Sequence, residues 1–190
     1  MSKPWPDLFV VTQFLESSLL ENIFAEMKAA EGGAALVYGS TGSGTVDESA
    51  RRTFRVTPSN ETLALVIQKL LELKDAIEKH FGVALKECEE PQFLRYREGD
   101  FFVAHQDGNT GMLRLDTEQR LISMVIFLSR ESESTEPGAY SGGSLVLSNL
   151  REQYRVPAES GMLVAFRSET THEVTPVTHG ERYSIASWFR

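Results

Sequence analysis

The triplet His105-Gln106-Asp107 places an imidazole and a carboxylate two residues apart. Side chains repeat with period two along an extended strand, so in a strand His105 and Asp107 would point to the same face. Two imidazoles and one carboxylate, with open coordination positions, form the facial triad typical of mononuclear iron(II) sites. The triplet therefore indicates two ligands of such a site, and the third ligand, a second imidazole, must come from elsewhere in the chain.

Three other histidines could supply that imidazole. His80 falls in the last turn of a predicted helix, where an imidazolium suits the helix dipole and no metal is needed. His179 lies in a turn between predicted strands and is expected to be exposed. His172 lies at the start of a predicted strand. In a jelly roll, strands that are distant in the sequence become neighbours, so His172 could meet His105 and Asp107.

Arg182 and Ser184 follow His172 in the last predicted strand and share one face by period two. A buried guanidinium is costly unless it is paired, but a guanidinium beside a hydroxyl is a good receptor for a carboxylate. These residues therefore indicate an anion-binding site next to the metal. In the alternative interpretation, Arg182 is a surface residue paired with Glu181 or another acid.

The composition fits one soluble globular domain: 190 residues, 41% hydrophobic and 24% charged. A net charge of -8 makes nucleic acid or an anionic membrane an unlikely partner, because both require clustered Lys and Arg. The single cysteine, Cys88, excludes an intrachain disulfide and fits a reducing compartment. We find no secretion signal and no apolar stretch of membrane-spanning length, so a cytoplasmic protein is expected.

The candidate metal ligands, Arg182 and Ser184 all lie in the second half of the chain, whose residue pattern is typical of a β protein. Short β-rich runs separated by turn signals predict a sandwich, barrel or jelly roll. The runs cover residues 83–88, 92–96, 100–105, 121–128, 144–147, 153–156, 161–166, 172–174 and 183–189. Short strands are also expected near residues 8–11 and 34–38.

Two amphipathic helices are predicted to pack on the outside of the sheet. The first covers residues 14–30 and ends at Gly32-Gly33; the second begins at Ser59 or Asn60 as N-cap and stops at Gly82. The chain thus reads as a single domain over residues 1–190, with a helical support region over 1–82 and a jelly-roll core over 83–190.

Several polar segments are expected at the surface. The glycine-rich stretch 39–44 lacks the Lys that a phosphate-binding loop requires and is predicted as a surface loop or lid. Residues 109–120 and 130–143 are predicted as mobile loops. Arg51, Arg52 and Arg55 suit a solvated edge-strand face, and the alternative is that one of them meets an acidic group of a substrate.

The motifs from residue 83 to 190, in their order and spacing, resemble the iron(II)- and 2-oxoglutarate-dependent oxygenases, specifically the prolyl-4-hydroxylase-like branch. The first iron-binding block of that family is similar to residues 92–96, Gly99 and His105-Gln106-Asp107. Its central strands and double-glycine turn are similar to Ser123–Ser129 and Gly142-Gly143-Ser144-Leu145. The final blocks match Pro157, Gly161, Phe166, His172, Val174, Pro176-Val177, Gly180, Arg182, Ser184 and Trp188.

This resemblance implies a double-stranded β-helix in which His105, Asp107 and His172 bind Fe(II). Arg182, assisted by Ser184, would hold the distal carboxylate of the co-substrate 2-oxoglutarate. O2 would be the oxidant, and ascorbate an optional reductant that keeps the iron reduced. The implied activity is that of a dioxygenase, hydroxylating an unactivated C–H bond with release of succinate and CO2.

Three aromatic positions qualify what the resemblance implies. Tyr96 would contribute a phenol hydrogen bond near the co-substrate, and the alternative is a core tyrosine with a satisfied hydroxyl. Peptide-acting prolyl hydroxylases often carry tyrosine where this chain has Phe102 and Phe127. The substrate is therefore left open among a prolyl or other protein residue, a free amino acid and another small molecule, and the oligomeric state is also open.

Asp107 fills the ligand position that a halide needs, so a halogenase is disfavoured. Two other functions are compatible with a jelly roll. A cupin-like metalloenzyme without 2-oxoglutarate would not need Arg182 and Ser184 beside the metal. A non-catalytic binding module would not bind Fe(II) tightly.

Overall fold

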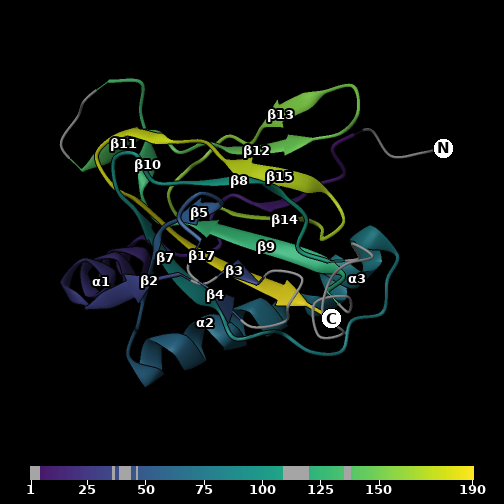
Figure 1. Cartoon of the computed structure of the whole chain (residues 1–190). Coiled ribbons are helices and arrows are strands. Elements are labelled where there is room, and N and C mark those ends of the chain that lie inside the picture. Colours follow the sequence, from purple (N-terminus) through teal and green to yellow (C-terminus); the bar gives the residue numbers. More distant parts are fainter. Residues whose placement is uncertain (1–4, 36, 39–43, 46, 109–119, 135–137) are drawn as a thin grey trace.

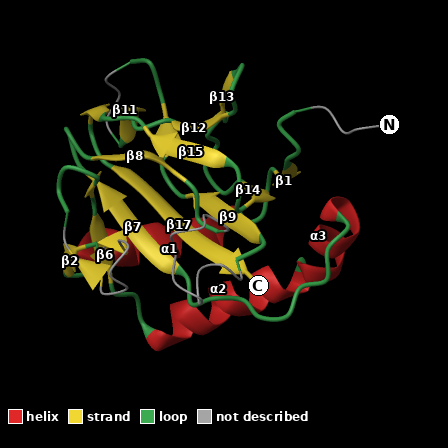
Figure 2. Ribbon diagram, turned by 45° about the vertical axis from the view of Figure 1, so that its right-hand side comes forward, coloured by secondary structure: helices red, strands yellow, loops and turns green. Residues whose placement is uncertain are grey.

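Two antiparallel sheets face each other, and three helices cover the outer face of the larger one (Figures 1 and 2). The structure is a computed structural model that describes residues 5–35, 37–38, 44–45, 47–108, 120–134 and 138–190. The predicted jelly roll with helices packed outside is thereby confirmed. In the described residues, no helix is long and apolar enough to cross a membrane.

The larger sheet has seven strands. Their spatial order is β1 (Phe9–Val11), β14 (Leu163–Arg167), β9 (Ile122–Phe127), β17 (Arg182–Phe189), β7 (Gln92–Tyr96), β6 (Phe54–Val56) and β2 (Gly32–Ala34). β17 runs through the middle of the sheet, and its side chains alternate between the two faces. Tyr183 and Ile185 pack toward the helices, so Arg182 and Ser184 point into the space between the sheets.

The smaller sheet has five strands, in the order β13 (Gln153–Arg155), β12 (Leu145–Ser148), β15 (Thr171–Val174), β8 (Phe101–His105) and β5 (Arg51–Arg52). A three-stranded sheet joins β10 (Arg130–Glu131), β11 (Ala139–Gly142) and β16 (Val177–His179), and β3 (Val37–Tyr38) pairs with β4 (Gly44–Thr45). All registered pairs are antiparallel except β10 with β11.

The helices are α1 (Ser17–Ala29), α2 (Asn60–Glu72) and α3 (Lys74–Phe81). Ser59 caps α2 by accepting a hydrogen bond from the Thr62 N–H at 3.2 Å, and Gly82 ends α3 in the left-handed conformation, as predicted. The second predicted helix is interrupted at Leu73, so it forms two helices instead of one. Val66, Leu70, Ile77 and other apolar side chains of the helices bury the main core against the larger sheet.

The prediction that Gly32 and Gly33 end α1 is wrong. The helix ends at Ala29, the chain is already extended at Ala30, and both glycines belong to β2. A Cβ atom on Gly32 would lie 2.8 Å from the Arg55 carbonyl oxygen, so this glycine serves the close pairing of β2 with β6.

Three further expectations need correction. Residues 83–88 form no strand beyond an isolated bridge from Cys88 to Phe189. The segment 130–143, expected as a mobile loop, contains β10 and β11. The region 1–82, expected as helical support, also supplies β1, β2, β5 and β6 to the two large sheets. Residues 39–43 of the glycine-rich stretch and residues 109–119 lie outside the described residues.

Candidate metal centre

The pairing of β8 with β15 brings His172 directly opposite His105, across 67 residues of sequence. The ring centroids of the two histidines are 4.2 Å apart. Asp107 completes the group, and the nearest ligand atoms of the three residues all lie within 4.8 Å of one another. The structure thus brings together the three residues that the sequence singled out as metal ligands.

Asp107 reaches the centre in a different way from the one expected. β8 ends at His105, and Asp107 lies in the bend that follows the strand rather than in an extended strand. Its backbone N–H donates to the Ser168 carbonyl at 3.0 Å, which fixes the bend against the end of β14. The side chain turns back toward both imidazoles, so the period-two argument found the pair although the local geometry differs.

Both imidazoles are oriented by backbone carbonyls. The Nδ1–H of His105 donates to the Val103 carbonyl at 2.8 Å, and the Nδ1–H of His172 donates to the Thr170 carbonyl at 2.9 Å. A carbonyl can only accept, so Nδ1 carries the proton in each ring and Nε2 faces the shared centre. This arrangement is typical of metal-binding histidines, whose second nitrogen donates to a carbonyl or a carboxylate.

The Asp107 carboxylate stands between the two Nε2 atoms. Its Oδ1 lies 3.5 Å from His105 Nε2, and its Oδ2 lies 3.3 Å from His172 Nε2. The Ser123 hydroxyl donates to Oδ2 at 2.7 Å and lies 2.9 Å from the Ser168 hydroxyl. The pairing and the hydrogen bond together hold the carboxylate in one orientation.

The electrostatics of the group favour an ionised carboxylate. Burial alone would raise the pKa of Asp107, but His172 and His105 outweigh it and hold that pKa well below its usual range. Burial and the neighbouring His172 lower the pKa of His105. Burial also acts against protonation of His172, but Asp107 raises its pKa. One anionic oxygen donor and two imidazole donors make the ligand set expected for Fe(II), so the residues fit this metal.

Aromatic rings surround the imidazoles. Phe102 stacks on His105 with centroids 3.6 Å apart, and Phe166 meets His172 edge-on at 4.9 Å. The Arg51 guanidinium lies 4.7 Å from the Phe102 ring centroid on the same strand pair, β5–β8. The rings limit water access to the centre and keep its local dielectric low.

Arg182 is buried between the sheets, with 2% of its surface exposed. Its Nη1 donates to the Ser184 hydroxyl at 2.8 Å, and its guanidinium lies 5.1 Å from the Tyr96 ring centroid and 5.5 Å from that of Phe127. The alternative of a surface residue paired with Glu181 is therefore wrong. Glu181 instead accepts from the Tyr183 hydroxyl at 2.7 Å.

The candidate metal centre and Arg182 border the same two apolar clusters between the sheets. Phe102, which stacks on His105, packs against the cluster that contains Tyr96, the ring beneath Arg182. Phe166, which touches His172, belongs to the cluster that contains Phe127. A buried cation thus lies across an aromatic-lined region from a cluster of potential metal ligands.

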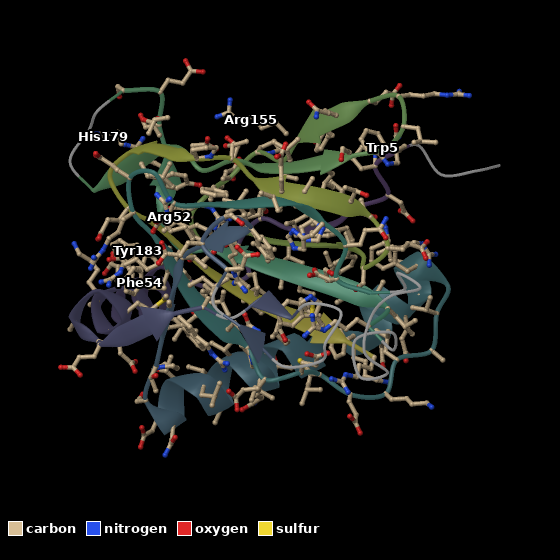
Figure 3. All side chains as sticks on the ribbon, viewed as in Figure 1. Trp5, Arg52, Phe54, Arg155, His179 and Tyr183 are labelled. Atoms are coloured by element: carbon tan, nitrogen blue, oxygen red, sulfur yellow. The ribbon has the colours of Figure 1, made fainter. Side chains whose placement is uncertain are left out.

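The remaining histidines lie elsewhere. His80 makes a 2.9 Å contact from Nε2 to Asp7, at the end of α3. His179 lies in β16 rather than in a turn, and it is partly exposed at the periphery of the molecule (Figure 3). Its Nδ1 lies 3.4 Å from Glu98.

The three arginines near the glycine-rich stretch have separate environments. Arg51 is buried against Phe102, whereas Arg52 is exposed and lies over the Phe101 ring. Arg55 forms an exposed ion pair with Glu90 at 2.8 Å. The solvated-face interpretation therefore holds for Arg52 and Arg55 and fails for Arg51.

The sequence analysis assigned no site role to Ser123, Ser168 or Tyr140. Ser123 of β9 donates to Asp107. Ser168, in the turn after β14, contacts the Ser123 hydroxyl and accepts from the Asp107 N–H, and Tyr140 lies beside Arg182. Serine and tyrosine are common in strands, so only their long-range register reveals these contacts. The structure is thus a jelly roll that holds a His–Asp–His cluster and, across an aromatic-lined region, a buried cation.

Comparison with known proteins agrees with this class. The family model of the 2OG-Fe(II) oxygenase superfamily matches residues 91–190. A PKHD-type hydroxylase of Burkholderia lata is 32% identical over 161 residues, which cover 81% of this chain and 66% of the relative. The matched part of this chain spans just under two thirds of the length of that relative.

Solved structures show the same fold. A prolyl-4-hydroxylase of Pseudomonas putida is 25% identical with a TM-score of 0.73, covering 97% of this chain and 92% of that one. A prolyl hydroxylase of Trichoplax adhaerens, in complex with a hypoxia inducible factor peptide fragment, is 16% identical with a TM-score of 0.72, covering 97% and 84%. The chain belongs to the 2OG-Fe(II) oxygenase superfamily. Membership implies Fe(II), 2-oxoglutarate and O2 as the reactive partners.

Proposed function

We propose that this chain is an Fe(II)- and 2-oxoglutarate-dependent dioxygenase that hydroxylates an unactivated C–H bond and releases succinate and CO2. The observation that carries the proposal is the locked tautomer of both histidines. Each Nδ1–H is held by a backbone carbonyl, so both Nε2 atoms are directed at the centre that Asp107 shares. A merely structural pair of buried histidines would not need two matching orientations around one carboxylate.

In this proposal His105, Asp107 and His172 hold Fe(II) on one side. Bound iron supplies the means to activate O2 at the expense of 2-oxoglutarate. Ser123 keeps the Asp107 carboxylate in place, and Phe102 and Phe166 exclude water from the centre.

Arg182 and Ser184 bind the distal carboxylate of 2-oxoglutarate. Burial at 2% exposure strengthens the attraction between the guanidinium and an anion, because little water competes. Tyr96 lies opposite Arg182 in the β7–β17 register and lines the same region. The predicted phenol hydrogen bond of Tyr96 to the co-substrate is part of this proposal.

The substrate is proposed as a prolyl or other residue of a protein, a free amino acid or another small molecule. The prolyl hydroxylase names of the structural neighbours favour a peptide among these. Phe102 and Phe127 remove hydroxyls that peptide-acting enzymes of the family often carry, so the small-molecule classes stay in the proposal. We place the enzyme in the cytoplasm and treat residues 1–190 as one domain.

The test combines binding with turnover. Calorimetry under nitrogen should show that Mn(II) binds and that 2-oxoglutarate then binds to the loaded protein. With Fe(II) and O2, succinate should form, and mass analysis of cell extract treated with the enzyme should find a product heavier by one oxygen. If 2-oxoglutarate neither binds nor yields succinate while Mn(II) does bind, a cupin-like metalloenzyme is the better description. Absence of metal binding would instead favour a binding module.

A further inference from the structure

Tyr140 is one of the largest fully buried side chains in the described structure, with 0% of its surface exposed. It lies in β11, between the partner strands β10 and β16, in a segment that is polar in sequence. Within the part of the chain that the structure describes, its hydroxyl finds no group that accepts its proton, and the guanidinium of Arg182 beside it can only donate. A buried tyrosine normally finds a partner for its hydroxyl, so this one is set up for a group that the protein itself does not supply.

Tyr140 and Arg182 approach each other across Gly143. A Cβ atom on Gly143 would lie 3.1 Å from Arg182 Cδ and 3.4 Å from Tyr140 Cε2, and the residue has a φ of +58°. Any larger residue would crowd both side chains, so the second glycine of the double-glycine turn allows them to share one site. Burial raises the pKa of Tyr140, and the nearby Arg182 guanidinium opposes that rise.

The hydrogen-bonding capacity of this pair is incomplete. A guanidinium carries donors only, so Arg182 cannot accept the proton of the Tyr140 hydroxyl. Ser184 uses one guanidinium nitrogen, Nη1, and Arg182 Nε has no partner among the described residues. A buried phenol donor and a buried cation therefore both await an acceptor, and a carboxylate offers two oxygens and the compensating charge.

The other rings around Arg182 do not provide this donor. Phe127 lies against the guanidinium but has no hydroxyl. In the family that this chain resembles, a tyrosine is frequent at that position. Tyr140 enters from a different strand, on a different sheet, and could return the missing hydroxyl to the same guanidinium.

We propose that Tyr140 is a further co-substrate-binding residue, whose hydroxyl donates to the distal carboxylate of 2-oxoglutarate held by Arg182. The assignment rests on the proposed function. It makes Tyr140 a determinant of co-substrate specificity, because a 2-oxo acid that lacks the distal carboxylate gains nothing from this hydroxyl. Gly143 is then required for the site as well as for the turn.

The experiment compares the 190-residue chain with its Tyr140→Phe variant, both loaded with Mn(II) and kept under nitrogen. Calorimetry measures the dissociation constants of 2-oxoglutarate and of 2-oxopentanoate, which has the same chain without the distal carboxylate. Losing a hydrogen bond to a charged group should raise the 2-oxoglutarate Kd by roughly 10- to 100-fold and leave the 2-oxopentanoate Kd within about twofold. Tyr183→Phe is the matched control, since its hydroxyl serves Glu181 instead, and it should change neither constant.

Two further measurements separate binding from packing. Tyr140→Phe should bind Mn(II) as the wild type does, and its ligand-free melting temperature should not fall, because the hydroxyl it loses donates to no protein group. A lower melting temperature together with equal losses for both ligands would overturn the assignment in favour of a packing role.

The remaining outcomes distinguish this inference from the proposed function. If wild type and Tyr140→Phe bind 2-oxoglutarate equally, the Tyr140 assignment is overturned while the proposed function stands. If the Mn(II)-loaded wild type does not bind 2-oxoglutarate at all, the proposed function fails, and the assignment of Tyr140 fails with it.

Discussion

The candidate site has two ends, which belong to different sheets and are stabilised differently. The metal end is the group of potential metal ligands, and the anion end is Arg182 with the side chains around it. His105 and His172 come from β8 and β15 of the smaller sheet, and Asp107 follows β8 directly. Each imidazole has a backbone acceptor, and Asp107 has a hydroxyl donor. Arg182 comes from the middle of the larger sheet. Among the described residues it has aromatic neighbours and one serine, but no carboxylate partner.

This difference shows which end depends on a ligand. At the metal end, two imidazoles and one carboxylate are paired with one another, so burying them costs the folded state little even without a metal. At the anion end, a buried cation and a buried phenol lack acceptors, and unpaired buried groups are costly. Binding of a carboxylate should therefore stabilise the anion end, because it supplies the acceptors that the protein does not. Substitutions at the two ends should also have separable effects.

The largest effect is expected at the metal end. Asp107→Ala removes the one carboxylate of the His105–Asp107–His172 group and should weaken Mn(II) binding by at least about 100-fold. Losing a ligand should cost more than the roughly 10- to 100-fold typical of losing a residue that only orients a ligand. His172→Ala should behave similarly. Calorimetry measures both, and His179→Ala, outside the site, is the control. If His172→Ala titrates like the wild type, the triad is misassigned.

At the anion end, Arg182→Ala should weaken 2-oxoglutarate binding by about 100-fold, corresponding to about 3 kcal/mol for a buried charge contact. The Mn(II) affinity should change much less, because none of the three predicted ligands contacts Arg182 directly in the described interactions. Arg182→Lys keeps the charge but loses the planar fork, so its 2-oxoglutarate affinity should fall between those of the wild type and Arg182→Ala. An unchanged apparent KM for 2-oxoglutarate in Arg182→Ala would show that the anion site is misassigned.

Ser123 tests how far the metal end extends beyond its ligands. Ser123→Ala removes the 2.7 Å hydrogen bond to Asp107 Oδ2 and should lower Mn(II) affinity by about 10-fold. At saturating Mn(II), the 2-oxoglutarate Kd should stay at the wild-type value, since the anion end is intact. Ser187→Ala is a matched control on β17, where the hydroxyl serves the Glu89 carbonyl. A fall in 2-oxoglutarate affinity at saturating metal would mean that the two ends are coupled through Ser123.

The sequence predicted the three candidate metal ligands together with Arg182, Ser184 and Tyr96, and it missed Ser123 and Tyr140. His105, Asp107, Arg182 and Ser184 stand out because such residues in β-rich runs require a chemical reason. His172 followed from setting aside His80 and His179, and the family resemblance implied the same residue. Ser123 and Tyr140 carry no such signal, since their roles depend on which strands become neighbours. The period-two pattern correctly placed Arg182 and Ser184 on one face of β17, which the structure turns inward.

The elements show the same division between local and long-range information. Ser59 and Gly82 mark helix ends by their own backbone and side-chain chemistry, and both were predicted. Gly32 was assigned to a helix end because its true role, close contact with Arg55 of β6, is set by a strand 22 residues away. β11 was missed for a similar reason: its pairing with β10 and β16, rather than local apolar periodicity, makes it a strand.

The smallest effect on the site is expected in the helical layer. Ser59→Ala removes the cap of α2 and should cost about 1 kcal/mol, or roughly 2–4 °C in melting temperature for a chain of this size. The helices pack against the outer face of the larger sheet, opposite the face that carries Arg182, so the Mn(II) and 2-oxoglutarate constants should remain at wild-type values. Thermal unfolding and calorimetry on the same preparations measure both quantities. A changed 2-oxoglutarate Kd with unchanged Mn(II) binding would show that the helical layer affects co-substrate binding at the anion end. It would also show that the larger sheet transmits strain from its outer face to Arg182.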